Sequence, residues 1–589
     1  MKRISLLRSC FIIYSILIFT NCISAKIDDE KKEFLKNSHR EDHFGIPFVY
    51  LQGTDYEVGY QYGFLLKDEL KLLYADFEVL KKDLMDKEIK YLPWYQRVVA
   101  NLFGSMVFRH KINNYADRLP SNIQDQLIGA SESSGLPVSF FREIQVIVDL
   151  YSNRCEAIIL KKGNHTYHCH NLDQPMPVSL ISKYPVVVNY NITGKQKYTD
   201  FGFISLFMVT TGFNESGISI SENGNNSPIH FDKENCSLYS DKSKLITETH
   251  NLNEVDSIVN TLKFPMGIIY TIASSSEKQA HVYDMIGLTK GKTIVNNYKF
   301  IANKTVSSEL GKKSETIRAG NFHETAREIK FAELIDTTKS DVIDGLIHIL
   351  SNSSFYHYTE PIPVYLESLH NYETDQSVIF DLADSTIYFT YNIHFAAWNR
   401  WLKYNYRTRK VSIYKEADPI LNNLFTSKLN EVYRNYESCD WRDTSNVRSV
   451  LNIVIRSGIN NYFSLNFLST TYLNNYNSPF QAEKYADTMI SKYPDIITGY
   501  YNKGLALEAE NKYKDAIDEY LNALDCKINC EYYLAETYEH LALLNNILNK
   551  KESAANYAAK ALTIHNQYWI PEYLNERINI LEKISKNQQ

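Results

Sequence analysis

The fold of this 589-residue chain is decided by one stretch, Cys155-Glu-Ala-Ile-Ile-Leu-Lys-Lys-Gly163-Asn-His-Thr-Tyr-His-Cys-His170-Asn171-Leu172-Asp173-Gln-Pro175. Runs rich in β-branched and aromatic residues lie on both sides of the turn signal Lys162-Gly163-Asn164, which is typical of a β-hairpin. A thiol begins the first expected strand, and Asp173 lies 18 residues further along the chain. The stretch therefore predicts that Cys155 begins an antiparallel sheet.

Further strand-like runs follow this hairpin, at residues 184–190, 203–211, 218–221, 268–272, 280–284 and 378–390. Helical patterns lie among them, at residues 254–262 and 324–350. Runs of strands followed by runs of helices favour an α+β layered domain over βαβ repeats.

The segment before the hairpin, residues 43–154, has a mostly helical pattern. Thr54-Asp-Tyr-Glu57 has the spacing of a capping box, and Gly59 and Gly63 allow close approach of another helix. A second helix is expected at residues 123–134, ending at Gly135-Leu-Pro137.

The last 150 residues are helical and repetitive. Large and small residues recur with a period of 34 that relates Ala482 to Ala516, and a 38-residue step then leads to Ala554. A four-residue insertion within residues 544–552 would explain the longer step. Residues 440–585 are predicted to form a tetratricopeptide-like solenoid with a capping helix near residues 571–584, and the alternative is an irregular helical bundle.

The first 25 residues predict export. Lys2, Arg3 and Arg8 precede an apolar run that is too short to span a bilayer, which indicates a secretory signal. Cleavage after Ala25 would release a soluble protein, whereas Cys22 in Phe-Thr-Asn-Cys could instead be acylated as a lipoprotein N-terminus that anchors the chain to a membrane. Residues 26–42 would form a polar tether. The expected location is extracytoplasmic: secreted, periplasmic or in the cell envelope.

Composition excludes several classes of protein. The 63 Lys and Arg against 69 Asp and Glu give a net charge of −6, which argues against a nucleic-acid partner. With 22 Gly and 15 Pro, the chain is neither collagen-like nor largely disordered. His168 and His170 would share one face of a strand while Cys169 points away, so these residues predict no metal site.

Five motifs in the correct order resemble the N-terminal-nucleophile (Ntn) cysteine hydrolases. The group includes the acyl-CoA:isopenicillin N acyltransferase family, the choloylglycine hydrolases, and acid ceramidase with N-acylethanolamine acid amidase. Its nucleophile strand opens with Cys and returns to an Asn-x-Asp element, as in the hairpin above. The other four motifs are Gly212-Phe-Asn214-Glu-Ser-Gly217, Phe300-Ile-Ala-Asn303, Thr325-Ala-Arg327 and Ser377-Val-Ile-Phe-Asp-Leu. Residues 53–63 resemble the propeptide helix of the acyltransferase branch, and the resemblance covers about residues 46–391.

The resemblance implies a four-layer αββα sandwich at residues 155–415, preceded by a propeptide at residues 43–154. It makes Cys155 the nucleophile and Asp173 the group that holds its α-amine. Asn303, with Asn214, would donate hydrogen bonds to the oxyanion, and Arg327 would support the site electrostatically. His170 and Asn171 would contact the substrate. No cofactor and no metal is implied.

The chemistry explains why an N-terminal cysteine is needed. A thiol that attacks an amide requires a base, and a free α-amine has a pKa of about 7.7–8.0, close enough to neutrality for that task. The amine exists only if the bond between Arg154 and Cys155 is cut, which the Cys155 thiol would do itself. The resulting enzyme would hydrolyse linear amides of N-acyl or lipid-like substrates through a thioester, or transfer the acyl group to an amine.

The sequence also departs from the family pattern. Glu156 follows the nucleophile where the family usually has Thr or Ser, His170 replaces an arginine of the amidases, and Lys304 replaces a histidine of the acyltransferase branch. The rival hypothesis is therefore an inert Ntn fold that serves as a surface platform, with its repeats binding a protein partner. A phospholipase B relative is a third alternative, without a specific motif match.

Overall fold

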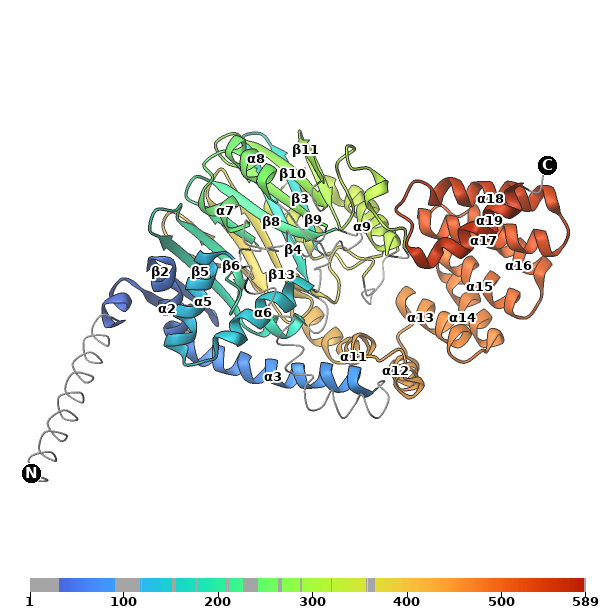
Figure 1. The fold of residues 1–589 in the computed structure, drawn as a ribbon, viewed down its shortest axis with the longest axis horizontal. Coiled ribbons are helices and arrows are strands. Elements are labelled where there is room, and N and C mark those ends of the chain that lie inside the picture. The colour runs from blue at the N-terminus through green and yellow to red at the C-terminus, as the bar shows by residue number, and fades with distance from the viewer. Residues whose placement is uncertain are drawn as a thin grey trace, which may run out of the picture.

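The chain folds into a β-sandwich with helices on both outer faces, followed by a helical array (Figure 1). The computed structural model describes residues 31–90, 117, 119–150, 155–174, 178–207, 209, 211–225, 242–262, 267–286, 289–318, 320–339, 341–355, 357–358 and 366–586. The expected signal segment with Cys22, the first part of the tether, and Arg154 at the expected cleavage site lie outside these residues.

A nine-stranded sheet forms one inner layer. In spatial order it contains β1 (His39–His43), β2 (Ile46–Gly53), β5 (Pro185–Ile192), β6 (Tyr198–Phe203), β7 (Thr211–Asn214), β8 (Ile218–Gly224), β9 (Ile268–Ser274), β10 (Gln279–Ile286) and β11 (Thr289–Val295). All neighbouring strands are antiparallel except β2 and β5, which are parallel.

A seven-stranded antiparallel sheet forms the other inner layer. Its order is β12 (Tyr298–Ile301), β3 (Glu156–Lys162), β4 (His165–Asp173), β13 (Thr374–Asp381), β14 (Thr386–Tyr391), β15 (Trp401–Asn405) and β16 (Val411–Lys415). The predicted hairpin is β3 and β4, and Gly163 in its turn has a φ of +61°, a conformation that favours glycine.

Side-chain alternation along β3 separates the layers. Ala157 and Ile159 belong to the core between the two sheets, whereas Ile158 and Leu160 pack with the helices on the other side. Aromatic rings pack across the inner core and join the two sheets. For example, the ring centroids of Phe201 in β6 and Phe389 in β14 are 5.1 Å apart.

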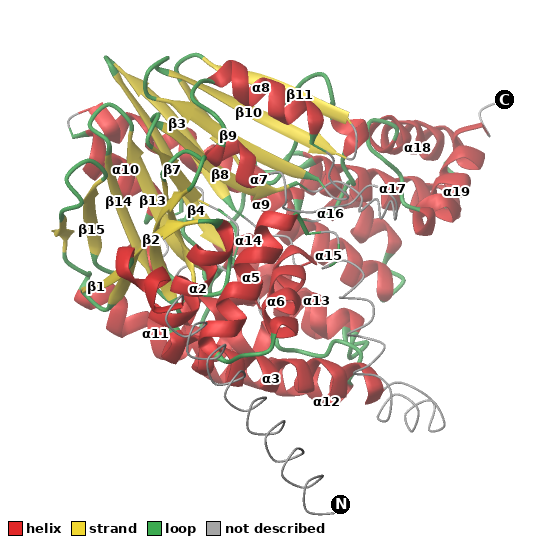
Figure 2. Ribbon diagram, turned by 60° about the vertical axis from the view of Figure 1, so that its left-hand side comes forward, coloured by secondary structure: helices red, strands yellow, loops and turns green. Residues whose placement is uncertain are grey.

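Helices cover both outer faces (Figure 2). The core of the nine-stranded sheet includes residues of α2 (Asp55–Leu65), α3 (Lys67–Lys90), α5 (Ser121–Ser134), α6 (Val138–Leu150), α7 (Lys242–Thr247) and α8 (Leu252–Thr261). The seven-stranded sheet packs with α9 (Asn321–Leu334) and α10 (Val342–Leu350). The predicted αββα sandwich is thus confirmed. Short 3-10 helices lie at Leu35–Asn37, Val178–Lys183, Lys312–Ser314, Ile335–Lys339, Ala396–Trp398 and Glu572–Leu574.

The glycines of α2 do allow a close helix crossing. A Cβ on Gly59 would lie 2.1 Å from the backbone oxygen of Gln126, and one on Gly63 would lie 2.4 Å from that of Ala130, both in α5. The capping box of Thr54 and Glu57 is also present.

Within residues 43–154, expected to be mostly helical, the described part also contains a strand. The apolar run at Ile46–Gly53 forms β2, which pairs with β5, and β1 turns part of the expected tether into an edge strand. The strand expected at residues 203–211 is wrong as well. Ser205 has a φ of +73°, which ends the strand, so β6 runs from Tyr198 to Phe203 instead.

The C-terminal part is all helical. It comprises α11 (Pro419–Glu437), α12 (Thr444–Ser457), α13 (Tyr462–Asn474), α14 (Pro479–Lys492), α15 (Ile497–Ala509), α16 (Tyr513–Leu524), α17 (Glu531–Ile547), α18 (Lys551–His565) and α19 (Asn575–Lys586). Three consecutive helix pairs, from α13 to α18, stack on one another and α19 packs on the last of them, so a helical solenoid is confirmed. The insertion lies in α17, which has 17 residues where α15 has 13.

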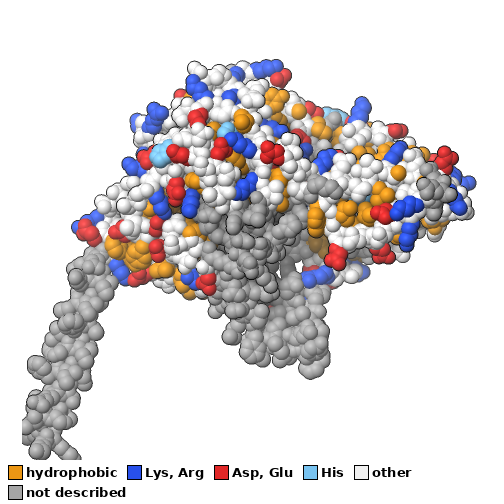
Figure 3. Space-filling model, turned by 45° about the horizontal axis from the view of Figure 1, so that its top comes forward, with side chains coloured by type: hydrophobic (Ala, Val, Ile, Leu, Met, Phe, Trp, Pro, Cys, Tyr) orange, Lys and Arg blue, Asp and Glu red, His pale blue; other side chains and the backbone are white. Residues whose placement is uncertain are grey.

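Charged side chains of both signs lie on the part of the surface that can be seen. On the face shown in Figure 3, basic and acidic side chains are interspersed. No helix within the described ranges is both long and apolar enough to cross a membrane.

Candidate active site

Cys155 lies at the head of β3, next to the last residue of β4. The β3–β4 register runs from Glu156 opposite Asn171 to Lys162 opposite His165, so the antiparallel hairpin brings its two open ends together. The thiol is fully buried between the sheets. Burial and the nearby charge of Asp173 raise the pKa of the thiol well above its ordinary value, while a hydrogen bond from the Asp173 backbone opposes them. At neutral pH the thiol is therefore protonated and needs a base in order to react.

Asp173 is held by the first residue of β13, the strand that pairs with β4, and by a residue just before that strand. Asn371 Nδ2 donates to one carboxylate oxygen at 2.8 Å, and the Thr374 hydroxyl donates to the other at 2.7 Å. The side chain is fully buried, and this burial raises the pKa of Asp173 to about 7 although the charge of Arg327 and both hydrogen bonds lower it. The carboxyl thus titrates near neutrality.

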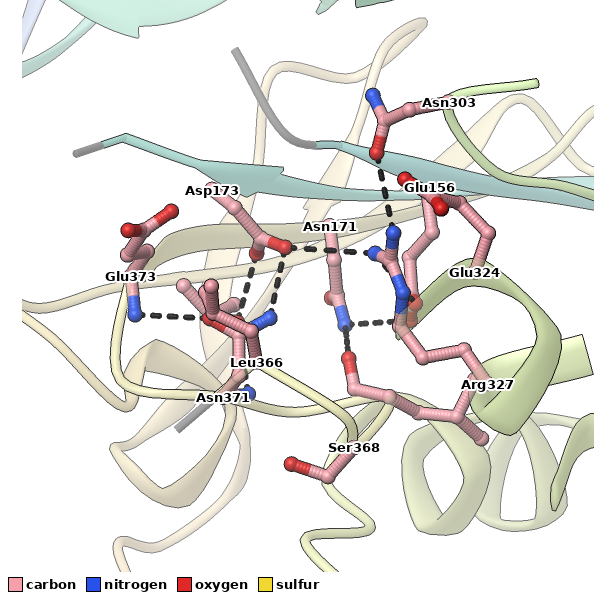
Figure 4. A network of polar contacts seen from close by, with 12 residues as sticks. Glu156, Asn171, Asp173, Asn303, Glu324, Arg327, Leu366, Ser368, Asn371 and Glu373 are labelled. Carbon is pink, nitrogen blue, oxygen red and sulfur yellow. Dashed lines mark hydrogen bonds and ion pairs between the residues drawn. The ribbon is translucent and has the colours of Figure 1, made fainter. Parts of the chain in front are cut away.

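Arg327 of α9 joins the groups of the site (Figure 4). Its Nη2 donates to Asn303 Oδ1 at 3.0 Å, and its Nη1 lies 3.6 Å from Glu156 Oε2 and 3.7 Å from Asp173 Oδ2. The guanidinium is buried, so it faces the two carboxyl groups with little water to screen them. One cation thus balances two buried acids and orients an amide.

Asn303 reaches the site from the edge of the seven-stranded sheet. The last residue of β12, Ile301, pairs with Ala157, which places Asn303 beside the start of β3. Its amide group is oriented at both ends, because Nδ2 donates to the backbone oxygen of Gly224 at 2.8 Å while Oδ1 accepts from Arg327. Asn303, Arg327 and Asp173 therefore form one network around Cys155.

Glu156 also belongs to this network, although the resemblance gave it no role. It is fully buried, and Asn171 Nδ2 donates to its Oε1 at 3.0 Å. Burial raises the pKa of Glu156 well above its ordinary value, which Arg327 partly offsets. Its position in the sequence, directly after Cys155, was the signal that could have indicated it.

Asn214 does not approach Cys155. It is the last residue of β7, at the far end of the β7–β8 hairpin from Thr211 and Ser221. Its Nδ2 donates to the backbone oxygens of Ile246 and Thr249, and its Oδ1 accepts from Ser216 and Ile218. The amide is used by the local backbone, so an oxyanion role for Asn214 has no support in this geometry.

His170 and Asn171 point in opposite directions from β4. The His170 ring bonds to the Thr211 hydroxyl and to the backbone oxygen of Glu222 across the sandwich, and it is fully buried. Asn171 faces α9 and α10, where it donates to Glu156 and to the backbone oxygens of Leu350 and Leu369. Both side chains are engaged with protein groups, and their predicted contact with substrate stays untested.

The sequence did not reveal Asn371 and Thr374, which hold Asp173. It also did not reveal Asn223, near the end of β8. Asn371 and Thr374 come into contact with Asp173 only because β13 pairs with β4. Asn223 Nδ2 donates to the backbone oxygen of Ile301 at 3.2 Å, beside Asn303. No local motif marks these residues.

A small cavity of about 120 Å³ adjoins the network on the α9 side. Asp173 and Arg327 line it together with Arg318, Gly320, His323, Glu324, Leu366 and Asn371.

The side chains of β4 alternate as predicted. His168 bonds to Ser219 and Ser221 of β8, while Cys169 packs on the helix side. A separate cluster of side chains of the kinds that bind metal ions, His165, Asp381 and Asp384, lies at the end of the β4–β13 pair that is opposite Asp173.

The arrangement brings together a buried thiol, an acid held by two hydrogen bonds, and an amide fixed by a buried arginine. These are parts that acyl transfer through a thioester can use.

Comparison with known proteins gives only distant likenesses. No family model and no curated protein matches the chain. Among solved structures, the Caenorhabditis elegans N-acylethanolamine-hydrolyzing acid amidase ortholog is 14% identical with a TM-score of 0.29, covering 39% of this chain and 93% of its own. A mutant conjugated bile acid hydrolase from Clostridium perfringens is 14% identical with a TM-score of 0.30, covering 44% and 96%. YrrB, a TPR protein with an unusual peptide-binding site, is 16% identical with a TM-score of 0.20, covering 28% and 92%. Scores and identities this low do not establish a shared activity.

Proposed function

We propose that this chain is a self-processing cysteine hydrolase that cleaves linear amide bonds of N-acyl substrates. One observation carries the proposal: a fully buried cysteine heads a strand beside Asp173, within a network that also holds Arg327 and Asn303. A buried structural thiol would not require two buried acids and a buried arginine beside it, because such groups are costly to desolvate.

The first step is cleavage of the chain itself. The Cys155 sulfur attacks the carbonyl carbon of Arg154 and gives up its proton, the C–N bond breaks, and the peptide nitrogen takes up that proton as the Cys155 α-amine. The product is a thioester between Arg154 and the sulfur. Water then hydrolyses the thioester, which leaves a carboxylate on Arg154 and a free thiol on Cys155. The attacking thiol belongs to the chain that it cuts, so the thioester forms without a second molecule, and water is needed only for its hydrolysis.

The second step uses the new amine as the base. It accepts the thiol proton, the thiolate attacks the substrate carbonyl, and the proton passes to the leaving amine as the C–N bond breaks. Water or an acceptor amine then takes the acyl group from the sulfur. Asp173 would hold the α-amine, since it ends β4 beside the residue that heads β3 and its carboxylate is fixed by Asn371 and Thr374. Asn303 would donate to the oxyanion, a contact that is typically worth about 2.7–4 kcal/mol.

The proposal includes export, through release after Ala25 or acylation of Cys22. The proposed substrate class, N-acyl compounds including lipid-like ones, comes from the resemblance of the motifs to the Ntn cysteine hydrolases.

Intact mass spectrometry of the protein exported by its host tests the proposal. The expected spectrum has a break between Arg154 and Cys155, and the N-terminal mass distinguishes lipidation at Cys22 from cleavage after Ala25. Cys155→Ala should give one uncut chain. Cys169→Ala is the matched control, because Cys169 is equally buried in the neighbouring strand but faces the helices, and it should be cut normally.

The rival hypothesis, an inert platform, predicts different results. Wild-type protein that stays uncut and shows no thiol-dependent amidase activity on a panel of N-acyl amides would refute the proposal that the chain is an enzyme.

A further inference from the structure

One edge of the helical array packs against the sandwich. We define the docking edge as Tyr462, Tyr493, Ile496, Ile528 and Cys530, which lie in α13 and in the connections that follow α14 and α16. These residues share one buried cluster with Phe322 and Ala326 of α9 and with Phe355. In Figure 1, α9 lies between the strands of the sandwich and the array.

Aromatic rings make this contact specific. The Tyr462 ring is stacked on Phe322 with centroids 5.7 Å apart, and it lies 4.5 Å from the ring of Phe355. Tyr493 approaches Phe355 edge-on at 6.2 Å, and Tyr533 approaches Phe322 edge-on at 5.9 Å. Such ring pairs add to the stability gained from burial of their apolar area.

Polar bonds pin the contact on both sides of α9. Before the helix, the backbone N–H of Trp569 donates to the oxygen of Glu315 at 2.9 Å, and Lys312 pairs with Glu531. After it, the Tyr358 hydroxyl donates to Asp495. The array therefore holds the segment that contains α9 at more than one point.

The same helix carries a central residue of the site. Phe322 and Ala326 are four residues apart and present one face of α9 to the array. Arg327 is the next residue and points into the network, at 3.0 Å from Asn303 and 3.6–3.7 Å from the two acids. A shift of α9 by about 1 Å would disturb all three contacts, and displacements of that size typically cost up to about 100-fold in rate.

We propose that the helical array has a partner within its own chain: it binds α9 and thereby positions Arg327 for the chemistry at Cys155. The proposal rests on the proposed function for its effect on rate. Tyr462 is a positioning residue that acts through Phe322 and α9. The docking edge is filled by the sandwich, so recruitment of another protein would have to use a different face of the array.

A pair of matched variants tests this role. Tyr462→Leu removes the ring that stacks on Phe322. Tyr520→Leu is the control, because Tyr520 is equally buried in the array but its ring pairs with array residues, Tyr501 and His540. Tyr462→Phe keeps the ring and is the rescue variant.

Two measurements on the full chain are needed: the rate at which the bond between Arg154 and Cys155 is cut, and hydrogen exchange of residues 320–334. Tyr462→Leu should slow cutting by about 10- to 100-fold and speed exchange in α9, whereas Tyr520→Leu and Tyr462→Phe should change both by less than about threefold. Equal effects of the two leucine variants on both readouts would overturn the positioning role and leave the proposed function intact.

Failure of the proposed function has its own signature. If the wild-type chain is not cut, the enzyme is refuted, and exchange in α9 still decides whether the array holds this helix.

Discussion

Replacement of Asp173 by asparagine should change how stability depends on pH. The folded carboxyl has a pKa of about 7 against an ordinary 3.8, chiefly because it is buried, so the folded chain keeps its proton where the unfolded chain has lost it. A carboxyl with a raised folded pKa lends its full stability below pH 3.8 and loses it as the pH rises to 7. The shift of about three pH units corresponds to about 4 kcal/mol of lost stability above pH 7.

Asp173→Asn removes this loss, because an amide does not ionise. The oxygen of the new amide would still accept from Thr374, but its NH₂ group would face the NH₂ of Asn371, at a cost of about 1–3 kcal/mol that does not depend on pH. Between pH 5 and pH 8 the variant should therefore gain about 2–3 kcal/mol relative to its parent. Loss of the negative charge also lowers the pKa of nearby Glu156, which acts in the same direction.

Urea unfolding at pH 5, 6, 7 and 8 measures this difference. Both proteins should carry Cys155→Ala so that neither is cut, and the quantity of interest is the difference in unfolding free energy at each pH. Parallel curves for the two proteins would refute the reasoning, because they would show that Asp173 is not held at a raised pKa in the folded chain.

Three further predictions concern other parts of the molecule. Arg327→Lys should slow self-cleavage by about 100-fold on denaturing gels, because one ammonium cannot keep the contacts with Asn303 and the two acids at once; cleavage at the wild-type rate would contradict this. His168 is buried with its pKa lowered to about 3 by burial, so the chain should lose about 3 kcal/mol of stability as the pH falls from 6.5 to 4, and His168→Gln should remove this loss in acid unfolding curves. Gly59→Ala should lower stability by about 1–3 kcal/mol in thermal unfolding, since its Cβ would meet the backbone of α5; an unchanged midpoint would show that the helices can separate freely.

Sequence patterns determined the local parts of the site and fold. The β3–β4 hairpin follows from strand-forming residues around Gly163, and an antiparallel hairpin necessarily joins its open ends, so Cys155 and Asp173 meet whatever the rest of the chain does. The capping box at Thr54 and the insertion in α17 are likewise local, because they depend on spacing within a helix or between successive repeats.

Only the tertiary structure decided what surrounds Cys155. Arg327 and Asn303 reach Cys155 from α9 and from the end of β12, and their contacts depend on how distant layers stack. Tertiary packing likewise decided that the Asn214 amide bonds to nearby backbone groups and that β2 pairs with β5. Pairing between segments far apart in the chain depends on which partner edges and faces are available after folding, and no local residue pattern specifies that choice.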